Sequence, residues 1–536
     1  MTTLMMNLTM ESVVAHLSFT AKVCGGLLAA YIGYVAVKIV LRMKRVRKLA
    51  REEGCKPAPT YRKLDPILGL DILYEFIQEV KTHRTLEGPR KRHEDIGNTL
   101  ACRILGGKIM MTCEPENVKT ILATKFEDWQ IGAIRQELVP LIGRGIFTTD
   151  GPSWQHSRNL LKPMFTRSMI ADITVFEMHV DRFLSLLPYD GTTVDLQPLF
   201  FRLTLDITSH VMLGESTDLQ VTSAGTPAAD FAAAFQGGLS YFGESGEIPI
   251  FGYFYPTKAR KQFLKDCKFA NAYVDKFIDK ATDETQDPLF SPKSPGADPN
   301  RNILLYDLVS QEVPKDSIRS EVLNTILAGR DTTASLLSDM WFELSKHPKI
   351  FATLYEEVHE LAPPDAELTF DLIRAMPYLR AILNETLRFH PVVPGNSRQA
   401  SKDTVLPLGG GPDGKSPVFV PKGTLVAYMV YCMHRREDLW DDPDSFIPER
   451  WIDTDEKKGV RPGWAFLPFN GGPRICIGQQ FALLLVSYVT VRVIQGMREG
   501  GLESRDPEDW AENVTLTCVG LNGCKVGLFG NEKEQL

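Results

Sequence analysis

The chain has 536 residues, and its 60 Lys and Arg against 67 Asp and Glu give a formal net charge of −7. Hydrophobic residues make up 43% and charged residues 24%, a balance that is typical of a folded protein and excludes wholesale disorder and collagen-like repeats. The acidic balance argues against a nucleic-acid partner, which would require a basic face. The nine cysteines form no C-x-x-C pair, so we expect neither a disulfide framework nor a zinc ribbon, and place the bulk of the chain in a reducing compartment.

The N-terminal part contains an apolar run over residues 23–41, interrupted by Lys38. As a helix these residues span about 28 Å, close to the ~30 Å hydrocarbon core of a bilayer. Basic residues follow from Arg42 to Arg51, and such clusters stay on the cytosolic side. A cleaved signal peptide has the reverse order of charge and apolar run. We therefore predict a short luminal N-terminus over 1–22, with a glycosylation sequon at Asn7, and a transmembrane anchor over 23–41.

A basic, proline-containing linker is expected over 42–70, followed by a catalytic domain over 71–536. Helical periodicity dominates from about 110 to 400, with a polar surface loop at 282–302. Short β-like runs begin after 392, a long helix returns near 478–497, and 513–529 suggests a hairpin around Asn522-Gly523. The fold class is therefore mainly α with a smaller β portion, an α+β mixture and not alternating βαβ units.

Residues 409–416, GGGPDGKS, formally match the phosphate-binding pattern G-x-x-x-x-G-K-[ST]. A phosphate loop works because a helix starts directly after it and aims backbone N–H groups at the phosphate. Here Ser416 is followed by PVFVP, an extended run that cannot form that helix. We interpret the motif as a glycine-rich hairpin loop.

The most informative segment is 466–478, FLPFNGGPRICIG, in which a glycine-rich loop carries Cys476 to the start of a helix. Backbone amides that point at a sulfur there would stabilise a thiolate. The segment resembles the haem-binding loop of the cytochromes P450, F-x-x-G-x-R-x-C-x-G. This resemblance implies haem b as the cofactor and Cys476 as the axial ligand of its iron. The pattern is met at all five fixed positions by Phe469, Gly472, Arg474, Cys476 and Gly478.

A second motif, AGRDTT at 328–333, lies inside a helical pattern from about Asp316 to Lys346. Taken alone, such a cluster is a local kink. A threonine hydroxyl can also bond back into its own helix and, with Gly329, open a groove on one face. In the family that groove lies over the iron, and the resemblance implies that Asp331 and Thr332 relay protons to bound oxygen.

Two further motifs imply structural roles. Glu385 and Arg388, at i and i+3 on a helix from about Met376 to His390, lie on one helix face. With PERW at 448–451 they resemble the family's E-x-x-R and P-E-R-F set, in which Glu385, Arg388 and Arg450 form a buried ionic cluster. Trp451 stands where phenylalanine is commoner, a change that we expect to be harmless.

Trp154 and Arg158 lie at i and i+4, and the default interpretation is an indole packed under an arginine stem. In the family a W-x-x-x-R pair donates hydrogen bonds to a haem propionate, and a planar, permanently charged guanidinium suits that role. Arg398 and Arg474 match two further propionate-binding positions. His156 lies on the same expected helix, and we interpret it as not ligating the iron.

The resemblance spans nearly the whole chain and is closest to fungal P450s that hydroxylate n-alkanes and fatty acids, as the stretches 65–71, 145–158, 328–338 and 406–423 indicate. It implies electrons from NADPH through NADPH–cytochrome P450 reductase, with cytochrome b5 as a second candidate partner, and an endoplasmic-reticulum location with a cytosolic catalytic domain. An apolar small-molecule substrate that partitions into membrane lipid would suit the anchor. A tailoring enzyme acting on a polyketide or another lipid-like metabolite is the alternative, and peroxide rearrangement or a non-enzymatic haem scaffold are more distant ones. Candidate substrate contacts, by family position, are Phe147, Ala328, Val392, Val393 and Leu516.

Overall fold

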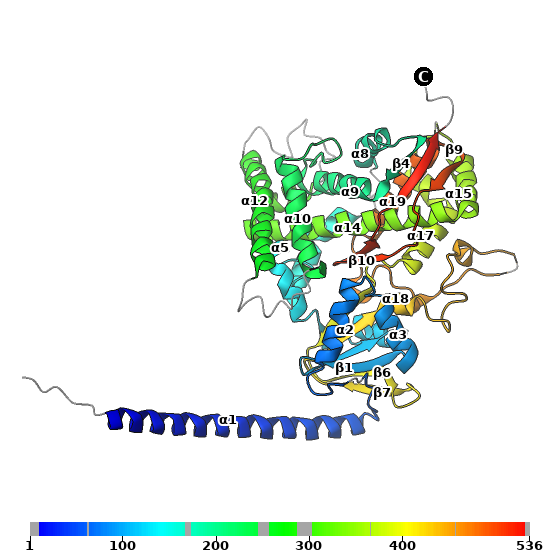
Figure 1. The fold of residues 1–536 in the computed structure, drawn as a ribbon. Helices are drawn as coiled ribbons and strands as arrows, with labels where there is room; N and C mark the ends of the chain where they lie inside the picture. Colours follow the sequence, from blue (N-terminus) through cyan, green and yellow to red (C-terminus); the bar gives the residue numbers. More distant parts are fainter. Residues whose placement is uncertain are drawn as a thin grey trace, which may run out of the picture.

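One long helix, α14 (Lys315–Lys346), runs through the middle of the molecule (Figure 1). The structure is a computed structural model, and it describes residues 10–61, 64–166, 173–244, 257–286, 303–364, 366–455 and 457–530. The bounds of α14 confirm the helix predicted over 316–346. The helix ends at Lys346, because His347 precedes Pro348 and the residue before a proline is disfavoured in the α conformation.

Helix α9 (Leu196–Leu213) lies against α14 and makes close contact at Gly329. A Cβ at Gly329 would lie 2.8 Å from the Thr208 hydroxyl, so the missing side chain lets the two helices approach each other. One turn away, the Thr204 hydroxyl donates a hydrogen bond to the carbonyl of Arg330 at 2.9 Å. This contact fixes α14 where the AGRDTT motif lies.

The largest hydrophobic core forms where α14 meets helices from the second half of the chain and α8 (Thr174–Ser185). Its fully buried aromatic residues include Trp341 and Tyr488. The helices predicted near 376–390 and 478–497 are confirmed as α17 (Pro377–Phe389) and α19 (Gln479–Gln495). The surrounding helices of this half are α15 (Pro348–Leu361), α16 (Phe370–Arg374) and α18 (Val430–Met433).

A second core covers the N-terminal half of α14, where Phe231 and Tyr273 stack with their ring centroids 4.4 Å apart. It is built by α10 (Pro227–Glu244) and α12 (Lys258–Gln286), with α5 (Val139–Ile142) and α13 (Leu304–Ser310). Most of the loop predicted over 282–302 lies outside the described residues, and α12 occupies its first part. The remaining short helices are α2 (Leu70–Lys81), α3 (Glu87–Ile96), α4 (Pro115–Lys119) and α6 (Gly151–Leu161).

The smaller β portion contains a five-stranded sheet in the order β1-β2-β8-β5-β3. Strands β2 and β8 are parallel, with Ile109 opposite Leu425, and the other pairs are antiparallel. Its strands are β1 (Thr99–Ile104), β2 (Gly107–Thr112), β3 (Trp129–Gln130), β5 (Gly395–Ala400) and β8 (Leu425–Met429). The structure confirms an α+β mixture dominated by helices (Figure 1).

The GGGPDGKS segment joins β6 (Thr404–Gly410) to β7 (Ser416–Val420), an antiparallel pair, so the interpretation as a hairpin loop is confirmed. The hairpin predicted around Asn522-Gly523 is wrong. The carboxylate of Asp195 accepts a hydrogen bond from the N–H of Cys524 at 2.9 Å, and the chain crosses there to another sheet. Strands β10 (Glu512–Val514) and β11 (Cys518–Gly520) pair together, and β12 (Lys525–Gly530) pairs with β4 (Asp190–Asp195) and β9 (Met497–Ser504).

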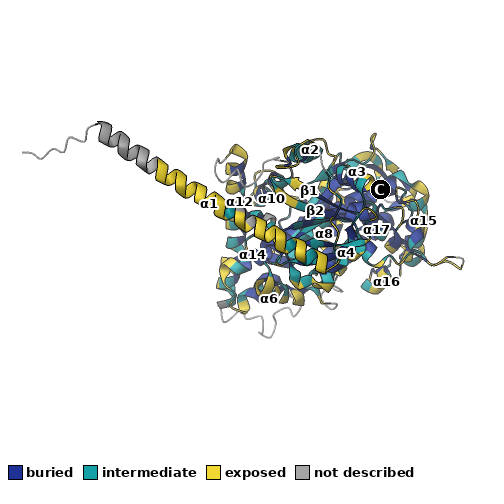
Figure 2. Ribbon diagram, turned by 90° about the horizontal axis from the view of Figure 1, so that it is seen from below, coloured by how far each residue is buried: buried dark blue, intermediate teal, exposed yellow. Residues whose placement is uncertain are grey.

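The N-terminal helix α1 (Met10–Glu52) extends beside the body (Figure 1), and its part after Lys22 is largely exposed (Figure 2). Over Lys22–Glu52 it is long and apolar enough to cross a membrane. The basic part of the stretch 42–70, expected to be a linker, continues the helix as far as Glu52. Arg42 Nη2 donates a hydrogen bond to the carbonyl of Lys422, beyond β7, at 2.7 Å. Asn7, with its predicted sequon, lies outside the described residues.

Candidate active site

The loop before α19 presents Cys476 to open space. Gly472 permits its path, because the φ angle there is +67° and a Cβ would lie 1.9 Å from the carbonyl oxygen of Leu122. The N–H of Cys476 donates to the carbonyl of Phe469 at 3.0 Å and closes the loop. Ile475 and Cys476 are both exposed, although the helix that follows is largely buried. The sulfur is therefore accessible to a ligand.

The protein around Cys476 raises the pKa of its thiol. The N–H of Gly478 and the charge of Arg158 both act in the opposite direction, but the loss of hydration outweighs them. The N–H of Gly478 therefore favours the thiolate, as expected from the sequence, while desolvation by the surrounding protein opposes it. A metal cation that coordinates the sulfur would favour the thiolate further.

The central helix α14 has one accessible stretch. Every residue from Ser320 to Ser345 is buried except Ala328, Gly329 and Thr332. The Thr332 hydroxyl donates to the carbonyl of Ala328 at 2.6 Å, which confirms a hydrogen bond back into the helix. Ala328, Gly329 and Thr332 are therefore the half-buried positions of this helix segment, between two fully buried parts.

Asp331 has a different environment from its neighbour Thr332. Its side chain is buried, and its Oδ1 lies 3.0 Å from Nη1 of Arg330. Burial raises the pKa of the Asp331 carboxyl, and the charge of Arg330 offsets this only in part. The two residues of the predicted acid–alcohol pair therefore have different surroundings. The Thr332 hydroxyl lies on the accessible face, and the Asp331 carboxylate lies beside Arg330.

Three arginines converge beside the cysteine loop. Arg135, from the 3₁₀ turn that precedes α5, and Arg398, from β5, both donate to Oδ1 of Asn396, at 3.0 and 3.2 Å. Arg474 donates to Asp150 Oδ1 at 2.7 Å. Burial, followed by repulsion between these guanidinium groups, lowers the pKa of Arg135 and of Arg474 to about 10. The cluster therefore holds more positive charge than its carboxylate partner Asp150 neutralises.

Helix α6 contacts the same loop through Trp154 and Arg158. The Trp154 indole is buried, and the guanidinium carbon of Arg474 lies 4.5 Å from its ring centroid. Arg158 Nη1 donates to the carbonyl of Ile475 at 3.1 Å. His156 is exposed on α6.

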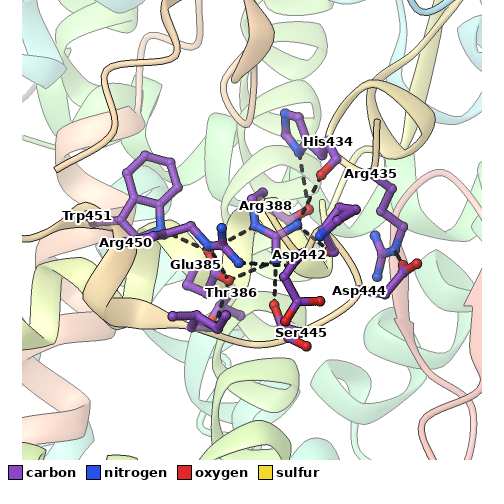
Figure 3. A network of polar contacts seen from close by, with 12 residues as sticks. Glu385, Thr386, Arg388, His434, Arg435, Asp442, Asp444, Ser445, Arg450 and Trp451 are labelled. Carbon is purple, nitrogen blue, oxygen red and sulfur yellow. Dashed lines mark hydrogen bonds and ion pairs between the residues drawn. The ribbon is translucent and has the colours of Figure 1, made fainter. Parts of the chain in front are cut away.

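The predicted ionic cluster is present (Figure 3). Glu385 and Arg388 are fully buried and joined by two hydrogen bonds of 2.9 and 2.8 Å, and Arg450 Nε lies 3.1 Å from Glu385 Oε1. The carbonyls of residues 434, 443 and 445 accept from Arg388, so the ion pair joins α17 to the chain that follows α18. Trp451 Nε1 also donates to Glu385 Oε2, at 2.9 Å.

Comparison with known proteins accords with this geometry. The family model for Cytochrome P450 matches residues 68–515. The chain is 39% identical to cytochrome P450 monooxygenase himC of Aspergillus japonicus over 503 residues, which cover 92% of this chain and 88% of that protein. It is 36% identical to cytochrome P450 52A13 of Debaryomyces hansenii, covering 97% and 99% of the two chains.

The chain belongs to the cytochrome P450 family. It is accordingly an oxidoreductase of the monooxygenase class with a haem-iron cofactor, and members of the family generally need a redox partner. The fold is also that of the cytochrome P450DA haem domain, whose crystal structure superposes with a TM-score of 0.73 at 22% identity, covering 90% of this chain and 99% of that one.

The residues present in this cytochrome P450 fit a haem. Its propionates are anionic, and the arginine cluster carries uncompensated positive charge beside the cysteine loop. The accessible sulfur of Cys476 would hold the haem iron, since P450 haem iron is bound by a cysteine thiolate. Leu327, next to the accessible stretch of α14, belongs to the hydrophobic core against which Ile477 of the cysteine loop packs.

The expected substrate contacts lie partly around that region. Phe147 and Leu516 pack against the same core as Ile477. Val392 is buried, with its carbonyl accepting from the N–H of Cys518 at 2.9 Å, and Val393 is half-buried. Phe147 and Leu516 thus share a hydrophobic core, and Val392 is bonded to the strand that follows Leu516.

Arg135 is a member of the site that we did not identify from the sequence. No motif surrounds it, and Asn396 on a distant strand brings it beside Arg398. The only available signal was a basic residue in an apolar stretch. The hydrogen bond of Trp451 was likewise not expected.

Proposed function

We propose that this P450 hydroxylates an apolar chain, such as a fatty acid or an n-alkane, using O2 and electrons from NADPH delivered by NADPH–cytochrome P450 reductase. The observation that supports it best is an accessible cysteine sulfur and an accessible threonine, each on a segment that packs against the same hydrophobic core, through Ile477 and Leu327. The resemblance to fungal alkane and fatty-acid hydroxylases names the substrate class. Cytochrome b5 is a second candidate electron donor.

Haem b, when bound, supplies the activation of O2 and the oxidation of a C–H bond. In our proposal Cys476 ligates its iron, and Phe469 and Gly478 shape the loop around that ligand. The propionates are held by hydrogen bonds and charge from the indole and guanidinium groups beside the loop. These groups belong to Trp154, Arg158, Arg398 and Arg474, together with Arg135 from the structure.

Thr332 and Asp331 move protons in this proposal. The Thr332 hydroxyl lies on the accessible face of α14, where it can donate to or accept from a ligand in the site. Asp331 is buried with Arg330 and would supply protons from the protein side. Glu385, Arg388 and Arg450 take no part in the chemistry and hold the fold around the cysteine loop.

The N-terminal helix supports a location in the endoplasmic-reticulum membrane, with one span and the catalytic domain in the cytosol. Its apolar stretch precedes a basic one, the order that leaves the following domain on the cytosolic side. An apolar substrate dissolved in the same bilayer would reach the enzyme without crossing water.

A tailoring enzyme that oxidises a polyketide or another lipid-like metabolite is the second candidate. It is favoured by one observation: himC, outside the 52A group, matches this chain as well as 52A13 does. Identity therefore does not separate the two substrate classes.

The decisive experiment is a reduced, CO-bound difference spectrum of the full-length protein beside Cys476→Ala. We expect a thiolate-type Soret band in the wild type and its loss in the variant. A spectrum that is indifferent to the substitution would contradict the haem assignment. Fatty acids and n-alkanes of graded length are then tested for type I spectral shifts and for product formation with reductase and NADPH. If these compounds give neither a shift nor a product while a polyketide gives them, the alternative function is favoured.

A further inference from the structure

The accessible residues of α14 lie on the same face as three buried carboxylates. Glu321, Ala328, Thr332, Asp339 and Glu343 follow one another at spacings of seven, four, seven and four, which place side chains on one side of an α-helix. The carboxylates are 2%, 1% and 4% exposed in chain order. Buried carboxylates are costly unless they are hydrogen-bonded, so the partners of these three show what they do.

Asp339 fixes the hairpin that carries Leu516. Its Oδ1 accepts from Trp510 Nε1 at 2.9 Å and from the N–H of Gly520 at 3.2 Å. Trp510 precedes β10 and Gly520 ends β11, so both ends of the hairpin are held by one oxygen. Leu516 occupies the turn between the two strands, and its place depends on this contact.

Glu343 fixes the chain that precedes Val392. Its Oε1 lies 2.6 Å from Nε2 of His390, at the end of α17. The His390 ring also packs on Trp510, with centroids 4.2 Å apart, so the Glu343 and Asp339 contacts form one network. Residues 392–393 follow two residues later.

Glu321 and its neighbour Asn324 fix the loop that carries Phe147. The backbone N–H of Ile146 and the Ser157 hydroxyl on α6 face the Glu321 carboxyl and favour its charged form. Asn324 Oδ1 accepts from the N–H of Phe147 at 3.1 Å. The loop and α6 are thereby attached to the same helix face.

We propose that Glu321, Asp339 and Glu343 are positioning residues that attach the walls of the substrate space to the helix bearing Thr332. The proposal deepens the proposed function and rests on its substrate space. The segments that carry Leu516 and Val392 have carboxylate contacts of their own, and the Phe147 loop is bonded to Asn324, beside Glu321. The position of a bound substrate relative to Thr332 is then set by polar contacts in the protein core, and the apolar wall residues determine the shape of the substrate space.

Asp339 gives the sharpest test, since Asp339→Asn keeps an acceptor oxygen and Asp339→Leu removes it at similar volume. Two probes are titrated spectrally into the full-length haem protein: imidazole, which reports the iron site, and 1-dodecylimidazole, whose tail also reports the substrate space. Hydrogen exchange of residues 511–520 is measured in parallel. For Asp339→Leu we expect a dodecylimidazole Kd raised at least tenfold, an unchanged imidazole Kd and faster exchange, with Asp339→Asn close to wild type.

An unchanged dodecylimidazole Kd in Asp339→Leu, or an equal weakening of both probes, would overturn the proposal. If Asp339→Leu yields no folded haem protein, Trp510→Phe removes one donor and keeps the ring beside His390. It is expected to raise the dodecylimidazole Kd about threefold, and no change would likewise overturn the proposal. Neither probe is a substrate, so the binding test does not depend on turnover. Wild-type enzyme that binds dodecylimidazole tightly but oxidises no fatty acid would contradict the proposed function and leave the positioning roles unaffected.

Discussion

Trp451 Nε1 donates a hydrogen bond to Oε2 of Glu385 at 2.9 Å, inside the ionic cluster that holds α17 to the chain after α18 (Figure 3). The carboxylate thus accepts from two guanidinium groups and one indole. A phenylalanine at 451 could fill much of the same volume but could not donate. Tryptophan at this position therefore adds a polar contact as well as volume.

Trp451→Phe should lower the free energy of unfolding by about 1.5–3 kcal/mol, the usual contribution of a hydrogen bond to a charged group. The matched control is Trp464→Phe, a half-buried tryptophan for which no indole hydrogen bond occurs among the described residues. Denaturant unfolding of the haem protein measures both. Equal losses in the two variants would show that only packing is affected.

Glu321 should make stability depend on pH. Burial raises the pKa of its carboxyl to about 7 in the folded protein, above its ordinary value of 4.5. Between those values the folded state binds a proton that the unfolded state has released, so stability falls as pH rises and the loss is complete above about pH 7. Glu321→Gln removes this proton linkage. The free energy of unfolding of the variant, relative to that of the wild type, should therefore rise by roughly 1–3 kcal/mol between pH 5 and pH 8.

Thermal unfolding of wild type and Glu321→Gln across that range checks the prediction. Glu116→Gln, an exposed carboxylate on α4, is the control and should follow the wild type. Parallel pH profiles for wild type and Glu321→Gln would contradict it.

Arg135→Leu should weaken haem retention, because it removes one of the positive charges that Asp150 does not neutralise. We expect haem transfer to a competing apoprotein to become about tenfold faster, equivalent to roughly 1.4 kcal/mol. Arg144→Leu, an exposed arginine a short distance along the chain, should leave the rate unchanged. Identical rates in the two variants would remove Arg135 from the propionate site.

Thr332→Val should uncouple NADPH consumption from product formation, since it keeps the shape of the side chain and removes the hydroxyl on the accessible face. We expect product per NADPH to fall roughly tenfold or more, within the range for a lost proton-transfer group. Thr332→Ser should retain most of the coupling. The CO-bound spectrum serves as the check on folding, and normal coupling in Thr332→Val would exclude the proposed role.

Local signals were sufficient for much of the molecule. Pro348 and Pro391 follow α14 and α17, and the hydrophobic periodicity between such breaks predicted both helices. The extended PVFVP run after Ser416 excluded a phosphate loop, and the hairpin there is confirmed. These features depend on residues a few positions apart, which a sequence displays directly.

Other features depend on residues far apart in the chain. The Asn522-Gly523 turn has good hairpin residues, but Asp195 captures the chain after it and sends it to another sheet. Arg135 joins the site through Asn396, and the parallel pairing of β2 with β8 has no local signature. The thiol environment of Cys476 also depends on how much protein surrounds it, which spacing does not reveal.

The continuity of α1 has a mechanical consequence. Its 43 residues form a rod of about 65 Å, roughly twice the ~30 Å of a bilayer's hydrocarbon layer. The rod meets the body at the bond between Arg42 and the carbonyl of Lys422, beside the β6–β7 hairpin. If α1 spans a bilayer as we propose, this contact would couple the tilt of the helix to the angle at which the body faces the lipid surface.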